Sequence, residues 1–509
     1  MSSSVPPVPV GARPRRVATW GWVLGLAALA FGVRLQTVLR GGGLFGRIGY
    51  DGSVYYASAA ALAHGLLPYR DFLLLHPPGI VLALLPFAAL GRLLGDANAF
   101  AEARLAWFGL GATSTALVFT IMRPRGLAPA VAGAACYAVF VPAVVSEHTT
   151  SLEAVGSVCL LGALALLRPS GVPPQAAWPF LTAGALLGTA SGTKIWGAAV
   201  VLAVVAWAVA RSGPRRAGLV LLGALGGASA VCLPFFVSAP GAMWRMVVLD
   251  QFGRPRVRGG LAGRLVDLAG FSELRGIAST RALAAVAAVL LAVLVVLALR
   301  EPLGRLACLL LAVTGTVLLL SPPWSVAYTG LAAPAVALLV GAGVARLGLT
   351  SVRARCVAAA VVGAGLVAYG AWSLPGLTFG TPFPGRSLER VLGPRPGCVT
   401  TDDPILLIET GSLHRNLARH CPTVVDPGGY SYDLRPSADH PTGRARDAEW
   451  QRFLRTHLAT GTTAVVVRFR RTPGLSGRTE AAIARWPVLA DVGGYLVRLP
   501  PGGGPGSTR

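Results

Sequence analysis

The sequence has 509 residues, of which 54% are hydrophobic and only 13% are charged, and its mean hydropathy is +0.62. A soluble protein needs more charge on its surface, so this composition excludes a soluble globular protein and predicts a polytopic α-helical membrane protein. The net charge of +24 does not indicate nucleic-acid binding, because the arginines form short clusters between apolar runs, where they orient spans and meet anionic lipid.

The chain begins with a basic flank, residues 1–16, which we expect to lie in the cytoplasm ahead of a first apolar run at 17–39. This run is longer than a signal-peptide core and no clear cleavage site follows it, so it predicts an uncleaved signal anchor. Ten more apolar runs bring the expected number to eleven transmembrane helices and extend the membrane module to residue 373: 104–122, 127–145, 152–167, 177–193, 195–210, 217–237, 281–299, 306–321, 326–345 and 357–373.

One further apolar run, 76–95, is ambiguous, and loop charge decides how it lies. If it does not cross, all the short arginine-rich loops fall in the cytoplasm, as the positive-inside rule requires; if it crosses, they all move outside. These loops are 123–126, 168–176, 211–216, 300–305 and 346–356. Three prolines in the run also suit an interfacial helix better than a span. We therefore expect an interfacial helix at 76–95 within one long first outer loop, 40–103.

The segment after the last span, residues 374–500, is expected outside the membrane as a small soluble domain. "CVTTDDPILLIETG" predicts a strand and then a helix, "DAEWQRFLRTHLATGTTAVVVRF" a helix and then a strand, and "GGYLVRLP" a last strand, which favours an α/β fold. Cys398 and Cys421 are its only cysteines, and an oxidising compartment predicts a disulfide between them. The tail, 501–509, is expected to be disordered.

Several motifs resemble the C-type glycosyltransferases, the membrane superfamily that includes protein O-mannosyltransferases, the aminoarabinose transferase of lipid A, and actinobacterial mannosyl- and arabinosyltransferases. They are an acidic residue early in the first outer loop, the block "ALAHGLLPYRDFLLLHPPG", a short acidic second outer loop, a lysine between paired spans, and "VVLDQFGRPR" at 247–256. The resemblance covers residues 17–345. It implies a plasma-membrane enzyme that moves a sugar, mannose or arabinose-like, from a polyprenyl-phosphate carrier to a glycan, glycolipid or protein acceptor outside the cytoplasm.

The resemblance places the general base of an inverting transfer at Asp51, because attack on the anomeric carbon needs a carboxylate that takes the acceptor proton. The alternative interpretation is that Asp51 caps a helix. The superfamily often has two adjacent acids here, whereas this chain has Gly52. We expect the second acidic group to be Glu147 in the second outer loop; Glu153 is either functional or a buried polar residue. His148 is a candidate for acceptor or phosphate binding, or a solvated loop histidine.

A departing polyprenyl phosphate needs positive charge where negative charge develops. Lys194, the only lysine in the chain, is the leading candidate, although it could instead be a snorkelling anchor at a span end. His76 and Arg70 are further candidates for the carrier phosphate, and Arg70 could alternatively pair with Asp71 to fix the loop. Weaker candidates for binding donor, substrate or lipid headgroups are Arg254, Arg256, Arg258 and Tyr328. No metal-ligand spacing is present, so no metal or cofactor is expected.

Two other functional classes stay open. A flippase or other transporter of lipid-linked sugars would also have many spans, but it should have repeated halves, which the sequence lacks, and it needs no acidic first loop. A non-catalytic glycan-binding membrane protein is the other, because the second of the adjacent acids is missing.

Overall fold

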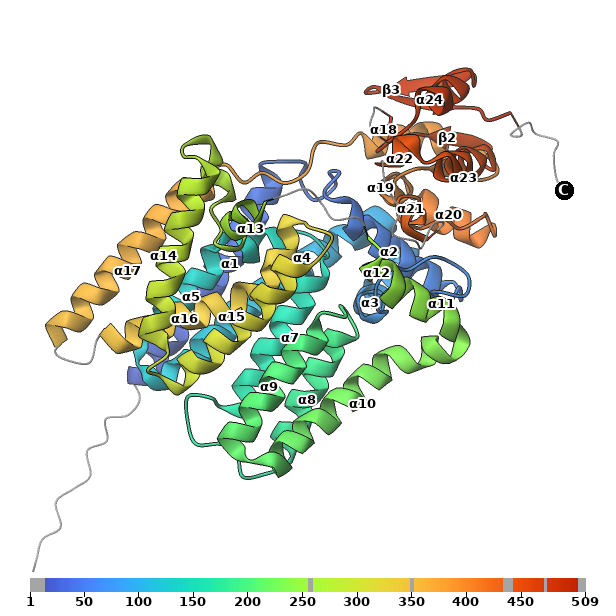
Figure 1. Cartoon of the computed structure of the whole chain (residues 1–509). Helices are drawn as coiled ribbons and strands as arrows, with labels where there is room; N and C mark the ends of the chain where they lie inside the picture. Colours follow the sequence, from blue (N-terminus) through green and yellow to red (C-terminus); the bar gives the residue numbers. More distant parts are fainter. Residues whose placement is uncertain (1–13, 255–259, 348–351, 434–442, 471–473, 502–509) are drawn as a thin grey trace, which may run out of the picture.

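The structure is a computed structural model that describes residues 14–254, 260–347, 352–433, 443–470 and 474–501. A bundle of long helices carries at one end a smaller C-terminal region of short strands and helices (Figure 1). Two predictions concern residues outside this description: the disordered tail, beyond residue 501, and the possible roles of Arg256 and Arg258.

Each of the eleven predicted apolar runs coincides with one helix or with two consecutive helices. The bundle consists of α1 (Pro14–Leu39), α4 (Asp96–Met122), α5 (Leu127–Val139), α6 (Val141–Glu147), α7 (Leu152–Leu167), α8 (Trp178–Ser191), α9 (Gly197–Ser212), α10 (Pro214–Ser238), α14 (Thr280–Ala298), α15 (Pro302–Leu320), α16 (Ala333–Leu347) and α17 (Val352–Ser373).

Six of the helical segments are long and apolar enough to cross a membrane, and the bent pair of α5 and α6, which meet at 53°, would make a seventh. The six are Thr19–Leu39, Asp96–Arg125, Pro214–Ser238, Thr280–Ala298, Pro302–Leu320 and Val326–Leu347. By contrast, α7, α8 and α9 have 16, 14 and 16 residues. At 1.5 Å per residue they are about 21–24 Å long, less than the roughly 30 Å of a hydrocarbon core. The chain is a multi-pass membrane protein, and within its described residues fewer helices reach the full span length than the eleven predicted.

Shorter elements connect the bundle helices and surround the start of α2. They are α2 (Tyr50–Ala63), α3 (Gly79–Leu94), η1 (Arg123–Arg125), α11 (Pro240–Trp244), the π-helical turn η2 (Arg245–Leu249), α12 (Asp250–Phe252), α13 (Leu261–Leu268), η3 (Ser272–Gly276) and η4 (Val326–Ala332). Figure 1 shows α2, α3, α11 and α12 between the bundle and the C-terminal region. One apolar core joins them, because buried side chains of α2 and α3 pack with Leu388, Leu406 and Val465 of the C-terminal region.

The C-terminal region contains one four-stranded sheet in the order β1-β2-β4-β3. Strands β1 (Val399–Thr401) and β2 (Thr463–Val465) are parallel, with Thr400 opposite Ala464, whereas β4 (Tyr495–Arg498) is antiparallel to β2 and to β3 (Val488–Val492). Its helices are α18 (Gly385–Leu392), α19 (Pro404–Glu409), α20 (Ser412–Ala418), α21 (Tyr430–Asp433), α22 (Gly443–Arg446), α23 (Ala448–Ala459) and α24 (Gly477–Ala484). The sequence predicted β1, α19, α23, β2 and β4 but not the hairpin partner β3.

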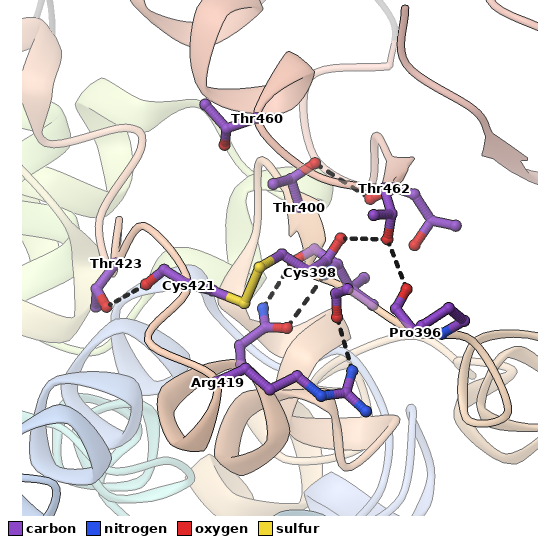
Figure 2. The surroundings of a disulfide bond; sticks show 12 residues. Pro396, Cys398, Thr400, Arg419, Cys421, Thr423, Thr460 and Thr462 are labelled. Carbon is purple, nitrogen blue, oxygen red and sulfur yellow. Dashed lines mark hydrogen bonds between the residues drawn. A yellow bond between two sulfur atoms is a disulfide. The ribbon is translucent and has the colours of Figure 1, made fainter. Parts of the chain in front are cut away.

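The disulfide that the sequence pairs joins Cys398, just before β1, to Cys421 in the loop after α20, with a Cα–Cα distance of 5.8 Å (Figure 2). Asn416 of α20 adds two hydrogen bonds to β1. Its side chain accepts from the Val399 N–H at 3.1 Å and donates to the Val399 carbonyl at 2.7 Å. The bridge and these two bonds fix α20 against the edge strand β1, on the side of the sheet that faces α2.

Candidate active site

Asp51 lies in the first turn of α2, at the point where the bundle meets the C-terminal region. The helix begins at Tyr50 behind Gly49, whose φ of 59° favours glycine, and no side chain caps it. The interpretation of Asp51 as a helix cap is therefore wrong. Its side chain is exposed and forms no hydrogen bond or ion pair within the described part of the chain. Apart from its favourable place at the N-terminus of α2, the carboxylate is therefore free to act on a ligand.

Charged groups from distant parts of the chain surround Asp51 and define a recess. The carboxyl is open to solvent but has protein on most sides, and this burial raises its pKa above the ordinary value; the Asp426 carboxylate raises it further. Arg254 and Arg468 act in the opposite direction. The Tyr50 hydroxyl donates to Asp426 at 2.8 Å, and the Arg468 guanidinium lies 4.3 Å from the centre of the Tyr50 ring. The recess is thus built jointly by α2 and the C-terminal region.

Two matched substitutions test this electrostatic environment through the pH dependence of activity. A general base must be deprotonated, so its raised pKa moves the acid limb of the profile to higher pH than an ordinary carboxyl would. Removing the neighbouring negative charge with Asp426→Asn should lower the pKa of Asp51 and extend activity to lower pH. Removing the positive charge with Arg468→Gln should shift the acid limb to higher pH. Profiles of kcat/KM against pH measure both; shifts of the same sign would exclude Asp51 as the titrating group.

Gly52 explains why a second acid does not follow Asp51. A Cβ atom at this position would lie 2.7 Å from Thr149 Oγ1 and 2.9 Å from Thr150 Oγ1, closer than van der Waals contact allows. The Thr150 hydroxyl also donates to the Gly52 carbonyl at 3.3 Å. Close packing of the second loop against α2 therefore excludes any side chain here.

Lys194 lies in the turn after α8 and is buried, with a relative exposure of 7%. Its ammonium forms an ion pair with Glu153 at the start of α7 and lies 3.8 Å from the centre of the Tyr328 ring and 4.2 Å from that of Trp196. A lysine with a buried acidic partner and two aromatic walls is not a snorkelling anchor, so that alternative is wrong. Asp51 and Arg254 are close enough to act on its charge.

The "HPPG" motif fixes the turn that carries Lys194. The Gly79 N–H, at the start of α3, donates to the Gly192 carbonyl at 2.8 Å. A Cβ on Gly79 would lie 2.4 Å from Thr193 Oγ1 and 2.7 Å from that carbonyl, so only glycine permits the contact. His76 precedes the two prolines, with its ring 5.8 Å from that of Tyr55. Burial lowers its pKa well below the ordinary value, and Arg254 and Lys194 add to the effect. A neutral His76 therefore faces the same positive charges as Asp51.

The "PYRDF" block forms a tight surface loop. Arg70 and Asp71 form an ion pair of 2.8 Å, and the Asp71 carboxylate accepts the Leu67 N–H at 2.7 Å. The Tyr69 hydroxyl donates to the His76 carbonyl at 2.7 Å. Arg70 is half exposed and bound to its neighbour, so the structure gives it the loop-fixing role. This pairing favours the loop-fixing alternative for Arg70 and Asp71; ligand binding by either residue stays a prediction.

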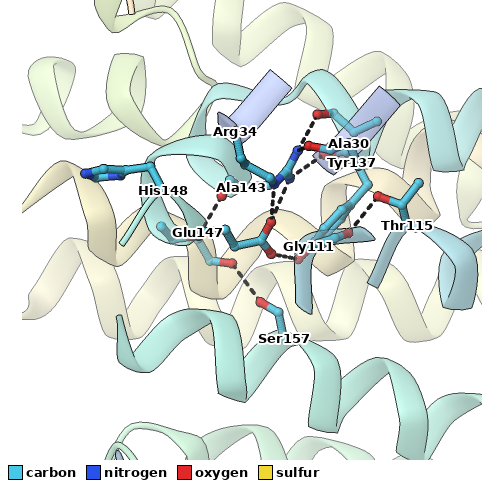
Figure 3. Close-up of polar contacts among 12 residues, drawn as sticks. Ala30, Arg34, Gly111, Thr115, Tyr137, Ala143, Glu147, His148 and Ser157 are labelled. Carbon is cyan, nitrogen blue, oxygen red and sulfur yellow. Dashed lines mark hydrogen bonds and ion pairs between the residues drawn. The ribbon is translucent and has the colours of Figure 1, made fainter. Parts of the chain in front are cut away.

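Glu147 is not at the mouth of a span, as predicted, but in the interior of the bundle (Figure 3). Its carboxylate forms an ion pair with Arg34 of α1 at 2.6 Å and accepts from the Tyr137 hydroxyl at 2.7 Å, and both charged residues are fully buried. Arg34 also donates to the Ala30 and Ala138 carbonyls. Glu147 is therefore wrong as the second acid, and Glu153 is the acid beside Lys194. A lone arginine inside the first apolar run was the missed signal for a buried acidic partner.

Two other predicted site residues occupy places the sequence did not suggest. His148 is stacked on Phe379 with ring centres 3.6 Å apart, and its Nδ1 lies 2.6 Å from the Val145 carbonyl. It is neither a solvated loop residue nor a ligand of the recess. Arg254 extends over the Tyr432 ring at 4.9 Å, and its charge acts on Asp51, His76 and Lys194.

A small apolar groove, with a volume of about 20 Å³, lies beside the Lys194–Glu153 pair between α7, α8 and α9. Besides the ion pair, its walls are small and aliphatic side chains, including Leu152, Gly156, Leu160, Leu187, Val200 and Leu331. Among the described residues, no cluster of three or more histidines, cysteines or acids could hold a metal ion. The site thus combines the unpaired Asp51 carboxylate, the positive charges of Lys194 and Arg254, and the apolar groove.

No protein-family model and no curated protein matches this sequence. Solved structures do match. ArnT from Cupriavidus metallidurans in the apo state aligns with a TM-score of 0.61 and 15% identity over 94% of this chain and 98% of ArnT. The same protein bound to undecaprenyl phosphate aligns with a TM-score of 0.56 and 16% identity over the same shares of both chains. The oligosaccharyltransferase AglB from Archaeoglobus fulgidus, in complex with an inhibitory peptide and a dolichol-phosphate, aligns with a TM-score of 0.57 and 10% identity over 89% of this chain and 70% of AglB.

The chain has the fold of the C-type glycosyltransferases. The resemblance drawn from the first outer loop is therefore confirmed.

Proposed function

We propose that the chain transfers a sugar, mannose or arabinose-like, from a polyprenyl-phosphate carrier to an acceptor outside the cytoplasm, with inversion of the anomeric carbon. The observation that carries the proposal is the unpaired Asp51 carboxylate in a cationic recess at the head of an apolar groove. A water-soluble nucleotide-sugar donor would need no apolar wall here, whereas the phosphate-proximal end of an isoprenoid chain would pack against these aliphatic side chains.

On the donor side, the aliphatic wall of the groove contacts the phosphate-proximal end of the isoprenoid chain, and the cations at its head take the phosphate. Two of the similar structures contain undecaprenyl phosphate and a dolichol-phosphate, respectively. Lys194 is already paired with Glu153, so Arg254 supplies positive charge that no acid in the described chain pairs with. The neutral His76 donates a hydrogen bond to a phosphate oxygen without adding charge.

On the acceptor side, Asp51 removes the proton of the attacking hydroxyl. The new glycosidic bond forms on one face of the anomeric carbon as the bond to the phosphate breaks on the other, so a single displacement inverts the centre. Charge passes to the departing phosphate, where Lys194 and Arg254 stabilise it. Glu153 holds the Lys194 ammonium toward this phosphate and so replaces Glu147 as the second acidic group.

The alternative of a non-catalytic glycan-binding protein rested on the absence of a second acidic residue next to Asp51. Packing against Thr149 and Thr150 accounts for that absence, and Glu153 supplies a second acid from another helix. Nothing in the described structure favours a flippase over a transferase.

The orientation of the chain follows from its arginine-rich loops, which meet at one end of the bundle. Arg125 pairs with Glu301, Arg211 donates to the Gly171 carbonyl, and Arg216 donates to Gln175. The positive-inside rule places this end in the cytoplasm and the recess outside. We place α3 at the outer interface because loop charge requires that it does not cross; its 16 residues do not decide this, since α7 and α9 are equally long. The disulfide of the C-terminal region suits the same compartment.

Membrane vesicles of defined orientation test activity and orientation together. Vesicles from a strain lacking the gene and complemented with it would receive radiolabelled polyprenyl-phosphate mannose or arabinose and a cell-envelope acceptor. We expect labelled product in right-side-out vesicles and none in sealed inside-out ones until detergent opens them. Transfer confined to intact inside-out vesicles would overturn the orientation, and no transfer of either sugar in any preparation would overturn the proposed donor.

A further inference from the structure

A second cavity, apart from the recess, lies between the junction of α3 and α4 and the near side of the C-terminal region. It has a volume of about 370 Å³, within the range of roughly 300–1,000 Å³ of small-molecule sites. Its walls combine two aromatic rings with polar side chains, among them Phe45, Asp96, Asn98, Phe383, Glu389 and Glu409. No residue of the proposed mechanism lines it.

Glu409, the last residue of α19, is the feature of this cavity that the fold does not use. The side chain is 4% exposed, and its Oε1 atom has no hydrogen-bond partner among the residues the structure describes. A buried polar atom without a partner destabilises the fold, and a ligand in the cavity would supply the missing hydrogen bond. Burial raises the pKa of Glu409 to about 8, while the charge of Arg104 opposes the shift. At neutral pH the carboxyl both donates and accepts.

Asp96 also lines the cavity, but its carboxylate has hydrogen-bond partners within the protein. Its carboxylate accepts from the His414 ring at 2.5 Å, from the His414 N–H at 3.2 Å and from the Tyr56 hydroxyl at 3.3 Å. Glu409 Oε1 is a buried carboxylate oxygen of this cavity that lacks a partner within the described chain, and Asn98 and Glu389 add exposed hydrogen-bonding groups around it.

We propose that this cavity binds one sugar unit of the acceptor, held by hydrogen bonds from its hydroxyls to Glu409 and Asn98 and by contact of its C–H face with Phe45 and Phe383. A hydroxyl donates and accepts at once, which suits a neutral carboxyl beside an amide. A metal ion is disfavoured, because no metal-binding cluster exists among the described residues.

The position of the cavity fits a membrane-proximal acceptor. Leu93 and Leu94, at the end of α3, are 83% and 48% exposed, and Leu94 also lines the cavity. On the inner side, α19 connects the cavity to the recess: Asp403 begins it and accepts from Ser53 at 3.3 Å, two residues beyond Asp51, and Glu409 ends it. Asp403 and Glu409 are therefore about 9 Å apart along α19. The assignment to the acceptor rests on the proposed function; the saccharide site itself does not.

Saturation-transfer NMR on the full-length protein in nanodiscs, free of sugar detergents, tests the site without turnover. The probes are methyl α-D-mannopyranoside and methyl α-D-arabinofuranoside. We expect transfer to the ring protons of one probe in the wild type and in Asp51→Asn, and at least a fivefold loss in Glu409→Ala. Asn98→Trp, at an exposed position, fills the cavity without touching the core and should give the same loss if Glu409→Ala does not fold.

Each other outcome counts against the site. Signals unchanged in both cavity variants, or abolished by Asp51→Asn, would place the saccharide in the recess and overturn the second site. No saturation transfer to either probe in the wild type would overturn the saccharide class. An alkyl mannoside carrying an eight-carbon chain distinguishes a glycolipid source from a soluble glycan, since only a lipid-side ligand should bind more tightly than the methyl glycoside. Failure of the vesicle assay leaves these results unaffected, so the two proposals fail separately.

Discussion

Replacing Asp51 with asparagine should reduce sugar transfer by roughly 10²–10⁴-fold while the protein folds and inserts normally. The amide keeps the size of the carboxylate but cannot take the acceptor proton. Because the Asp51 side chain makes no hydrogen bond or ion pair in the described chain, its replacement removes no structural contact. Single-turnover transfer from labelled polyprenyl-phosphate sugar, normalised to folded protein by gel filtration, measures the effect.

Asp71→Asn is the matched control for this experiment. It changes the same functional group in the same first outer segment, on a residue whose ion pair with Arg70 lies at the surface. We expect transfer within about twofold of the wild type, since exposed pairs contribute at most about 1 kcal/mol. Equal rates in Asp51→Asn and Asp71→Asn would move the general base away from α2, and Glu153 would be the next residue to test.

Breaking the ion pair of Arg34 and Glu147 should destabilise the bundle strongly. Glu147→Leu leaves the Arg34 guanidinium buried without its counter-charge, and losing one partner of a buried pair costs about 3–5 kcal/mol. Removing both charges in Arg34→Met/Glu147→Leu should recover most of that loss, because apolar side chains of similar volume avoid the desolvation cost. Thermal unfolding in detergent, followed by gel filtration of heated samples, measures the difference.

Glu301→Leu provides the comparison for a less buried pair. Glu301 pairs with Arg125 at 3.4 Å near the surface, where an ion pair contributes about 0–1 kcal/mol. If Glu147→Leu were no less stable than Glu301→Leu but had lost transfer, Glu147 would be a catalytic residue after all. Loss of stability in Glu147→Leu with recovery in the double variant would establish the structural role.

Much of the helical architecture could be predicted because each membrane helix is a continuous apolar run, which can be recognised from neighbouring residues alone. Every predicted apolar run is helical, and the run at 76–95 corresponds to α3, whose place at the interface stays a prediction from loop charge. Span lengths could not be predicted as well, because buried helices such as α8 need not reach across the hydrocarbon when neighbours cover them. The bend between α5 and α6 has a local cause in Pro142, yet its 53° angle is set by packing.

The site was predicted only where the chain signals chemistry locally. Asp51, Lys194 and His76 lie in motifs and come together in the structure. Glu147 and Glu153 could not be ranked, because six residues of sequence do not reveal that one turns toward Arg34 and the other toward Lys194. The contributions of Asp426 and Arg468 depend on contacts across more than 370 residues, which no local pattern records.

The hydrogen bond between Tyr50 and Asp426 joins the start of the chain to a part that the ribosome makes last. Until the C-terminal region has folded over α2, Asp51 lacks both the acid that raises its pKa and one of the two arginines that oppose it. A nascent chain with every membrane helix in place but no folded C-terminal region would therefore lack the charges of Asp426 and Arg468 around Asp51. Folding of the C-terminal region over α2 thus completes the surroundings of Asp51 after the membrane helices have formed.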